Sequence, residues 1–232
     1  MDVVFPCLNE EHALPWVLSR LPSGYRAIVV DNGSTDASAQ VATDAGALVV
    51  SEPRRGFGSA AHAGLTAATA PIVAFCDADA SMNPMDLEPL VALIDGGVAK
   101  LALGRRIPTT RGAWPLHARA ANLALSILMR RATGFALHDL GPMRAARRED
   151  LLELDLRDRR SGYPLEMVLA AASAGWSVSE LRTPYAPRIG RSKVTGTLKG
   201  TVTAVQDMSR LLRERPVSER RVRERLVREK RP

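Results

Sequence analysis

Short apolar runs that end in Gly, Asn, Asp or Pro alternate along the chain with Ala- and Leu-rich stretches of helical period. Such runs are typical of buried strands, and the longer periodic stretches are typical of helices. We expect strands near 2–7, 26–31, 47–51, 71–76 and 98–103. We expect helices near 11–20, 36–45, 58–69 and 86–95. This alternation predicts an α/β fold with a single, mainly parallel central sheet flanked by helices.

The pattern of apolar and polar positions changes after residue 106. Thr35 or Asp36 is a suitable N-cap for the second helix. Beyond residue 106 the pattern predicts helices near 117–131 and 163–174, strands near 141–144 and 176–183, a loop over 184–196 and a last helix from about 197. We therefore expect one folded domain, residues 1–212, followed by a tail, residues 213–232.

The net charge of +7 is concentrated in the tail. Residues 210–232 hold ten basic residues and four Glu, so the rest of the chain is nearly neutral. A segment of this kind is attracted to anionic membranes, and we expect peripheral contact there.

An alternative interpretation of the basic tail is a non-enzymatic, basic nucleic-acid-binding protein. Interleaved Glu and the lack of aromatic residues for base stacking speak against it, so we expect no nucleic-acid partner.

Cysteine content indicates the compartment. Cys7 and Cys76 stand at the ends of predicted strands, and no signal peptide precedes the first strand. Buried thiols in a reducing cytoplasm are the better interpretation than a disulfide. No stretch approaches 18 uninterrupted apolar residues, so we expect no membrane-spanning segment. The expected location is cytoplasmic, with peripheral contact at the inner face of the membrane.

The most informative motif is Asp77-Ala78-Asp79, two carboxylates at the exit of the apolar run 70–76. A second acidic turn, which begins at Asp31, closes an earlier strand. Ligands of open α/β sheets bind at the carboxyl ends of the strands. Carboxylate oxygens are suitable ligands for Mg²⁺ or Mn²⁺ that holds a diphosphate. The chain is therefore predicted to be a metal-dependent enzyme that uses a nucleotide-sugar.

Two basic loops complement these carboxylates. Arg54-Arg55-Gly56 is predicted to lie beside a nucleotide and to open a helix whose N-terminus favours anions. The glycines that follow do not have the spacing of a dinucleotide-binding fingerprint. A later loop holds Arg188, Arg191 and Lys193, and such a loop can close over a leaving diphosphate and stabilise its charge.

Taken in order, several motifs resemble the family 2 glycosyltransferases of GT-A fold, within them the branch of dolichol-phosphate mannose synthase and bacterial polyprenyl-phosphate glycosyltransferases. The matching segments are Pro6 to Glu11, Val30 to Asp36, Arg55 to Gly58, Asp77 to Asp79, Gly104 to Arg106, Asp139 to Pro142, Tyr163 to Glu166 and Arg188 to Lys193. The resemblance covers roughly residues 2–208 and implies that residues 1–212 form a GT-A glycosyltransferase domain. It does not specify the sugar or the acceptor.

The resemblance also implies roles for individual residues. The base and ribose would be surrounded by Pro6, Leu8, Glu10, Asp31 and Arg54 to Gly56. Asp77 and Asp79 would bind the metal, with Asp77 and Ala78 beside the donor. The diphosphate or an acceptor phosphate would be faced by Arg106, Arg188, Arg191 and Lys193. Ser81 stands where the mannose synthase pattern commonly has Gln, so that metal contact is not expected from the pattern.

Members of this family invert the anomeric centre by direct displacement. A hydroxyl acceptor needs a carboxylate to take its proton, and the candidates are Asp139 and Glu166. A polyprenyl phosphate is already anionic and needs no strong base. The alternative enzyme class is a sugar-phosphate nucleotidyltransferase, which usually has a Gly-rich basic loop after the first strand. Here that position is occupied by Pro6 to Glu10, which is acidic.

Overall fold

The computed structural model describes residues 1–190 except 111–112 and 114–115, and within these residues the strands form one sheet. The strands are β1 (Asp2–Cys7), β2 (Arg26–Asp31), β3 (Leu48–Ser51), β4 (Ile72–Phe75), β5 (Leu101–Pro108), β6 (Arg144–Arg147) and β7 (Val178–Tyr185). The helices are α1 (Leu14–Leu18), α2 (Ser38–Asp44), α3 (Phe57–Ala67), α4 (Leu87–Asp95), α5 (Leu116–Thr133), α6 (Arg148–Glu153) and α7 (Tyr163–Ser173), with a short 3₁₀ turn at Pro84–Asp86.

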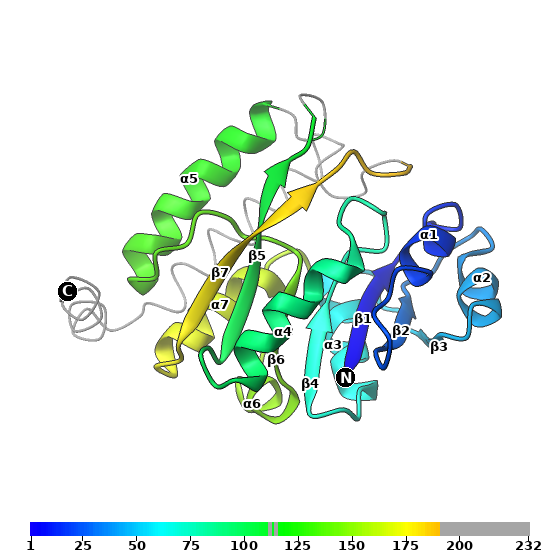
Figure 1. Cartoon of the computed structure of the whole chain (residues 1–232), viewed down its shortest axis with the longest axis horizontal. Helices are drawn as coiled ribbons and strands as arrows, with labels where there is room; N and C mark the ends of the chain where they lie inside the picture. Colours follow the sequence, from blue (N-terminus) through cyan, green and yellow to red (C-terminus); the bar gives the residue numbers. More distant parts are fainter. Residues whose placement is uncertain (111–112, 114–115, 191–232) are drawn as a thin grey trace.

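The sheet order is β3-β2-β1-β4-β6-β5-β7. All neighbouring pairs are parallel except those of β6, which runs antiparallel between β4 and β5. Figure 1 shows β3 toward one end of the described structure and α5 toward the other. The predicted α/β class, with one mainly parallel sheet flanked by helices, is confirmed.

Two buried clusters cover the two faces of the sheet. One joins β1 residue Val4 to Leu65 of α3, Met129 of α5 and Leu165 of α7. The other joins the next residue of β1, Phe5, to helices α1 and α4. Because successive side chains of a strand point to opposite faces, an uninterrupted apolar strand buries both sides. This explains why the central strands contain no alternation of apolar and polar residues.

The predicted strands are confirmed in the first half, but several boundaries were wrong. Helix α2 begins at Ser38, and neither Thr35 nor Asp36 caps it. Asp36 instead accepts hydrogen bonds from the backbone N–H groups of Ser38 (3.0 Å) and Glu11 (3.2 Å), so its side chain organises a turn before the helix. Residues 11–13 form turns, and α1 starts only at Leu14.

The region before β6 also differs from the prediction. The strand expected over 141–144 begins at Arg144, and the following helix α6 was not predicted. Gly141 packs against the backbone carbonyl of Gly104, where a Cβ would collide with the oxygen. The chain therefore approaches β5 closely before it can enter the sheet. The predicted last helix from 197 and the tail lie outside the described residues.

Asp2 ties the start of the sheet together. Its carboxylate, 2% exposed, accepts hydrogen bonds from Arg26 Nε (2.8 Å) and Nη2 (2.7 Å) and from the N–H groups of Thr69 (2.7 Å) and Ala70 (2.9 Å). Burial alone would raise the pKa of Asp2, but the hydrogen bonds from Arg26, Ala70 and Thr69 outweigh it and lower the pKa below its ordinary value.

We expect Asp2→Asn to lower the free energy of unfolding by about 2 kcal/mol near neutral pH, since it removes the charge that these four donors share. A depressed folded-state pKa stabilises the fold above the unfolded-state pKa, and this contribution is lost as the pH falls through the folded-state value. Urea denaturation should therefore show a difference between wild type and variant that is constant near pH 7 and shrinks below about pH 4. A difference independent of pH would contradict this account.

In the described part of the chain, no helix has both the length and the apolar character that a bilayer crossing requires.

Candidate active site

The acidic motifs meet at one edge of the sheet because β1, β2 and β4 are parallel neighbours. Cys7 at the end of β1 is paired in register with Asp31 at the end of β2. Asp31 accepts a hydrogen bond from the N–H of Ser34 (2.9 Å), which fixes the turn after β2. Pro6, Leu8 and Glu10 belong to the end of β1 and the segment after it, so the predicted base and ribose residues lie at this edge.

Asn32 organises the loop beside this edge, a role that the sequence did not reveal. Its side chain, in a residue that is 5% exposed, donates to the carbonyl oxygens of Glu52 and Arg54, both at 2.8 Å. Its amide oxygen accepts from the N–H of Gly56 (2.8 Å). One buried amide thus holds the predicted nucleotide loop against β2. The sequence shows only an Asn directly after a predicted strand, and its burial and partners come from the fold.

The N-terminus of α3 does not carry the anion site that the sequence predicted. The N–H groups of Gly58 and Ser59 donate to the carbonyl oxygens of Arg160 (2.8 Å) and Arg159 (2.9 Å). A Cβ on Gly56, which has φ of 146°, would collide with the same Arg159 carbonyl. The glycines of this loop are therefore required for close backbone packing, and the helix donors are already used.

Asp77, Ala78 and Asp79 follow β4, and the loop after β7 closes over them. Asp79 is 4% exposed, and its Oδ2 lies 2.9 Å from Nη2 of Arg188. The same loop donates the N–H of Ile189 to the carbonyl oxygen of Asp79 at 2.9 Å. The predicted meeting of this acidic motif with a basic loop is thus present in the fold. Arg191 and Lys193 lie outside the described residues.

The two carboxylates of the motif compete for positive charge. Burial raises the pKa of Asp77 to about 7, and the negative charge of Asp79 adds to the shift, whereas Arg188 and Arg106 act against it. A carboxylate beside a like charge favours its neutral form unless a cation lies nearby. Arg188 supplies one here, and a divalent cation would satisfy the same requirement.

The oxygen atoms available around Asp77 and Asp79 decide whether such a metal fits. Ser81 follows Asp79 by two residues, is 1% exposed, and its Oγ has no hydrogen-bond partner among the described residues. Within those residues no group of three His, Cys, Asp or Glu side chains could hold a metal by itself. Asp77 and Asp79 therefore fit a Mg²⁺ or Mn²⁺ ion only if the remaining ligands come from a diphosphate and water, which is usual for Mg²⁺.

Arg106 and Asp139 form a buried pair at the same end of the sheet. Asp139, 2% exposed, accepts from Arg106 Nη2 (2.7 Å), Nε (2.8 Å) and backbone N–H (2.9 Å). The fork of a guanidinium matches a carboxylate in this bidentate geometry. Arg106 was predicted to face a phosphate and Asp139 to take a proton. The structure pairs the two side chains with each other, and both roles stay predictions.

Glu166 is similarly enclosed. The residue is 1% exposed at the start of α7, and its Oε2 accepts the N–H groups of Arg157 (2.9 Å) and Asp158 (2.7 Å). These hydrogen bonds hold the segment that packs against α3. Glu166 therefore has a clear structural task, whatever its part in the chemistry.

Arg144 is a buried cation that the sequence did not single out. It is 3% exposed and donates to the carbonyl oxygens of Pro164 (3.0 Å) and Gly141. Burial lowers its pKa to about 10, although the charges of Asp139 and Asp77 act in the opposite direction. Arg144 of β6 therefore adds a buried positive charge that interacts with Asp77 and Asp139 of the acidic site.

Comparison with known proteins identifies the family of this chain. The family model described as "Glycosyl transferase family 2" matches residues 2–154. An uncharacterized glycosyltransferase of Mycobacterium tuberculosis is 54% identical over 213 residues, which cover 91% of this chain and 97% of the relative. A dolichyl-phosphate hexose transferase of Haloferax volcanii is 30% identical over 220 residues and covers 93% of this chain and 95% of its own length.

A solved structure has a similar fold. It is glucosyl-3-phosphoglycerate synthase from Mycobacterium tuberculosis in complex with Mn²⁺, uridine-diphosphate-glucose and phosphoglyceric acid. The two chains are 25% identical with a TM-score of 0.72, and the match covers 92% of this chain and 78% of the other. The sheet and its flanking helices are those of the GT-A glycosyltransferases. By its family match and its relatives, the chain belongs to glycosyl transferase family 2.

Proposed function

We propose that this protein is a metal-dependent, inverting hexosyltransferase that moves a sugar from a UDP- or GDP-linked donor to a polyprenyl phosphate. The observation that carries the proposal is the juxtaposition of Asp77 and Asp79 with Arg188 at the carboxyl ends of parallel strands. The solved relative with Mn²⁺ and uridine-diphosphate-glucose supports the donor class. The dolichyl-phosphate hexose transferase supports the acceptor class.

Donor binding is assigned to the edge formed by β1, β2 and β4. Base and ribose would contact Pro6, Leu8, Glu10, Asp31 and the loop from Arg54 to Gly56. Asp77 and Asp79 would hold Mg²⁺ or Mn²⁺, and the bound ion would neutralise the charge that develops on the leaving diphosphate. Ala78 lies between them, beside the donor.

Arg188 is assigned to the leaving group. It now pairs with Asp79, so a cation at the two carboxylates would free its guanidinium for the diphosphate. Arg191 and Lys193 of the same loop, and Arg106 beside Asp139, are assigned to the diphosphate or to the acceptor phosphate. The proposal therefore places positive charge on both sides of the transferred sugar.

The choice of a phosphate acceptor rests on the state of the two candidate bases. Asp139 is hydrogen-bonded to Arg106, and Glu166 holds the backbone of residues 157–158. A hydroxyl acceptor needs a carboxylate that can take its proton, whereas a phosphate acceptor is already anionic. Both carboxylates are buried and already accept hydrogen bonds from other groups of the protein, which favours an acceptor that needs no base, a phosphate.

Glu166→Gln separates the two acceptor classes. With a short-chain polyprenyl phosphate we expect kcat within about fivefold of wild type, because an anionic phosphate needs no general base. Where a general base is needed, its removal typically costs about 10²-fold or more. If the acceptor is instead a small molecule with a hydroxyl group, as the phosphoglyceric acid of the solved relative suggests, Glu166→Gln should show that larger loss of transfer. Single-turnover transfer should be measured, with the exposed Glu149→Gln as the matched control. A loss of 10²-fold in Glu166→Gln alone would return it to the role of base.

For Arg188→Ala we expect kcat to fall by about 10²-fold with a much smaller change in KM for the donor, because its charge acts mainly on the leaving group in the transition state. Steady-state kinetics at saturating metal should separate the two parameters. Arg20→Ala, which removes an exposed arginine near Trp16, is the control. A change in KM alone would mean that Arg188 only binds the donor.

The donor base is tested without the acceptor. Thermal shift with UDP, GDP and dTDP in the presence of Mn²⁺ should select one nucleotide, since a ligand at 100 times its Kd adds about 2.7 kcal/mol of stability. Release of inorganic pyrophosphate during turnover would instead identify a nucleotidyltransferase.

Peripheral contact of the basic tail, residues 213–232, with anionic bilayers stays a prediction, to be tested by liposome sedimentation after truncation at Leu212.

A further inference from the structure

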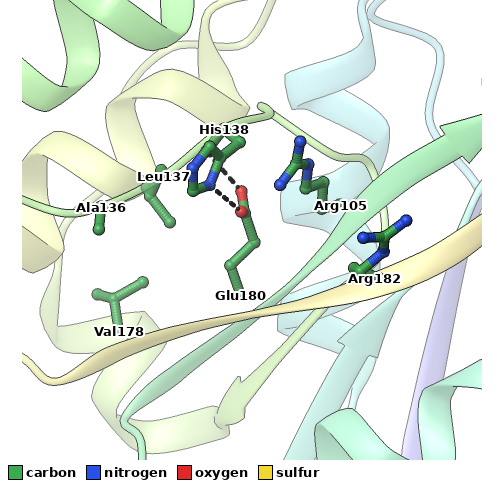
Figure 2. A pocket seen from close by; sticks show the side chains of 7 residues that line it. All are labelled: Arg105, Ala136, Leu137, His138, Val178, Glu180 and Arg182. Atoms are coloured by element: carbon green, nitrogen blue, oxygen red, sulfur yellow. Dashed lines mark hydrogen bonds and ion pairs between the residues drawn. The ribbon is translucent and has the colours of Figure 1, made fainter.

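A pocket of about 270 Å³ opens beside β5 and β7, on the side where α5 and α7 lie. It is lined by Arg105 of β5, by Val178, Glu180 and Arg182 of β7, and by Leu137 and His138 of the connection between α5 and β6. Figure 2 shows the two arginines and the His138–Glu180 pair around one hollow. The cavity therefore combines cationic groups with a small apolar wall.

The two arginines are direct neighbours across the sheet. Arg105 is paired in register with Arg182 on the adjacent parallel strand. Like charges placed side by side on one face of a sheet are destabilising. Neither side chain has a hydrogen-bond or ion-pair partner among the residues that the structure describes, so no direct contact with a carboxylate there offsets their repulsion.

The carboxylate of Glu180 lines the same pocket, but its hydrogen bonds go to the pocket wall and not to the two arginines. Its Oε1 accepts the N–H groups of His138 (2.8 Å) and Asp139 (3.0 Å), and its Oε2 lies 2.8 Å from Nδ1 of His138. The side chain of Glu180 is only 9% exposed. It therefore fixes the position of the His138 ring at the rim and leaves the guanidinium groups to another anion.

This pocket lies apart from the acidic site. Arg105 and Arg106 are consecutive in β5, and successive strand residues point to opposite faces. Arg106 accordingly lies against Asp139 and Tyr185, whereas Arg105 faces Glu180 and Arg182. Within the described residues β7 is the edge strand of the sheet. A charged side chain that protects an edge strand from pairing with another chain would explain Arg182, but it would not explain Arg105, which belongs to the inner strand β5.

We propose that this pocket is a binding site for a small phosphate monoester. Two guanidinium groups can hold the phosphate oxygens by charge-assisted hydrogen bonds, and the wall of Leu137 and Val178 accommodates a short apolar portion. Two sources share this chemistry, a soluble phosphorylated metabolite and the head of a prenyl phosphate. The site shares β5 with the Arg106–Asp139 pair, but it lies on the opposite face of that strand, so its occupant would be held apart from the transfer site.

The test is isothermal titration calorimetry of the full-length protein at low salt, without metal or nucleotide, with inorganic phosphate, glycerol 3-phosphate and geranyl phosphate as probes. Omitting metal and donor separates this result from the proposed transfer activity. We expect Arg105→Gln and Arg182→Gln each to weaken binding of the phosphate monoesters about tenfold, since one charge-assisted hydrogen bond is lost. Arg182 is exposed, so its variant keeps the assay usable if Arg105→Gln does not fold.

Arg147→Gln is the matched control, because Arg147 is exposed and lies on β6 opposite Ile72, at the start of β4 and away from the pocket. It should bind as wild type does. Tighter binding of geranyl phosphate than of glycerol 3-phosphate identifies a prenyl phosphate as the occupant, and the reverse order identifies a soluble one. Unchanged affinity in both pocket variants, or an equal loss in Arg147→Gln, overturns the site.

Discussion

Asp79→Ala is expected to lower sugar transfer by about 10³-fold or more while leaving the protein folded. The carboxylate is assigned to the metal, and loss of that charge stabilisation corresponds to about 4 kcal/mol in the transition state. Its partner Arg188 keeps 29% of its side-chain surface exposed and can be solvated once the carboxylate is gone. Transfer should be measured at several Mg²⁺ and Mn²⁺ concentrations, together with the thermal midpoint.

The control is Asp95→Ala, which removes an exposed carboxylate at the end of α4. It should retain full activity. EDTA should stop turnover of both wild type and control. Full activity of wild type in EDTA, or of Asp79→Ala in excess metal, would remove the metal from the account.

Arg106→Ala is expected to lower both the stability and the activity. It leaves Asp139, 2% exposed, without its guanidinium, and breaking a buried ion pair in this way costs about 3–5 kcal/mol. Activity should also fall, because Arg106 is assigned to a phosphate of the reaction. The single variant cannot separate these two effects.

A double variant, Arg106→Met with Asp139→Leu, separates them. Replacing both members of a buried pair by apolar residues is often close to neutral in stability, so most of the unfolding free energy should return. Transfer should not return if the pair serves the reaction. Denaturant unfolding and single-turnover transfer on the same preparations provide the comparison, and an active double variant would show that the pair is only structural.

The fold was predictable where the signal is local. The apolar runs of β1, β2 and β4 are short, uninterrupted and followed by turn residues, so their boundaries were readable. The antiparallel insertion of β6 between β4 and β5 was not readable, because strand order depends on contacts between distant segments. The start of α2 was misplaced because Asp36 bonds the turn and not the helix end.

The same distinction applies to the site. Asp77 and Asp79 stand out locally as paired carboxylates after a strand, and their neighbourhood with Arg188 was anticipated from the family resemblance. The pairing of Arg106 with Asp139 joins residues 33 positions apart, and no local pattern marks it. Arg144 and Asn32 were overlooked for a related reason, since a buried polar side chain is identified only by the partners that the fold provides.

The most direct test of the account is product analysis with a short-chain polyprenyl phosphate, Mg²⁺ and a series of UDP- and GDP-linked hexoses. One donor should yield glycosyl lipid and free nucleoside diphosphate in equal amounts, with inverted anomeric configuration, and EDTA should abolish both products. Release of pyrophosphate, or formation of glycosyl lipid that continues without a divalent metal, would contradict the account.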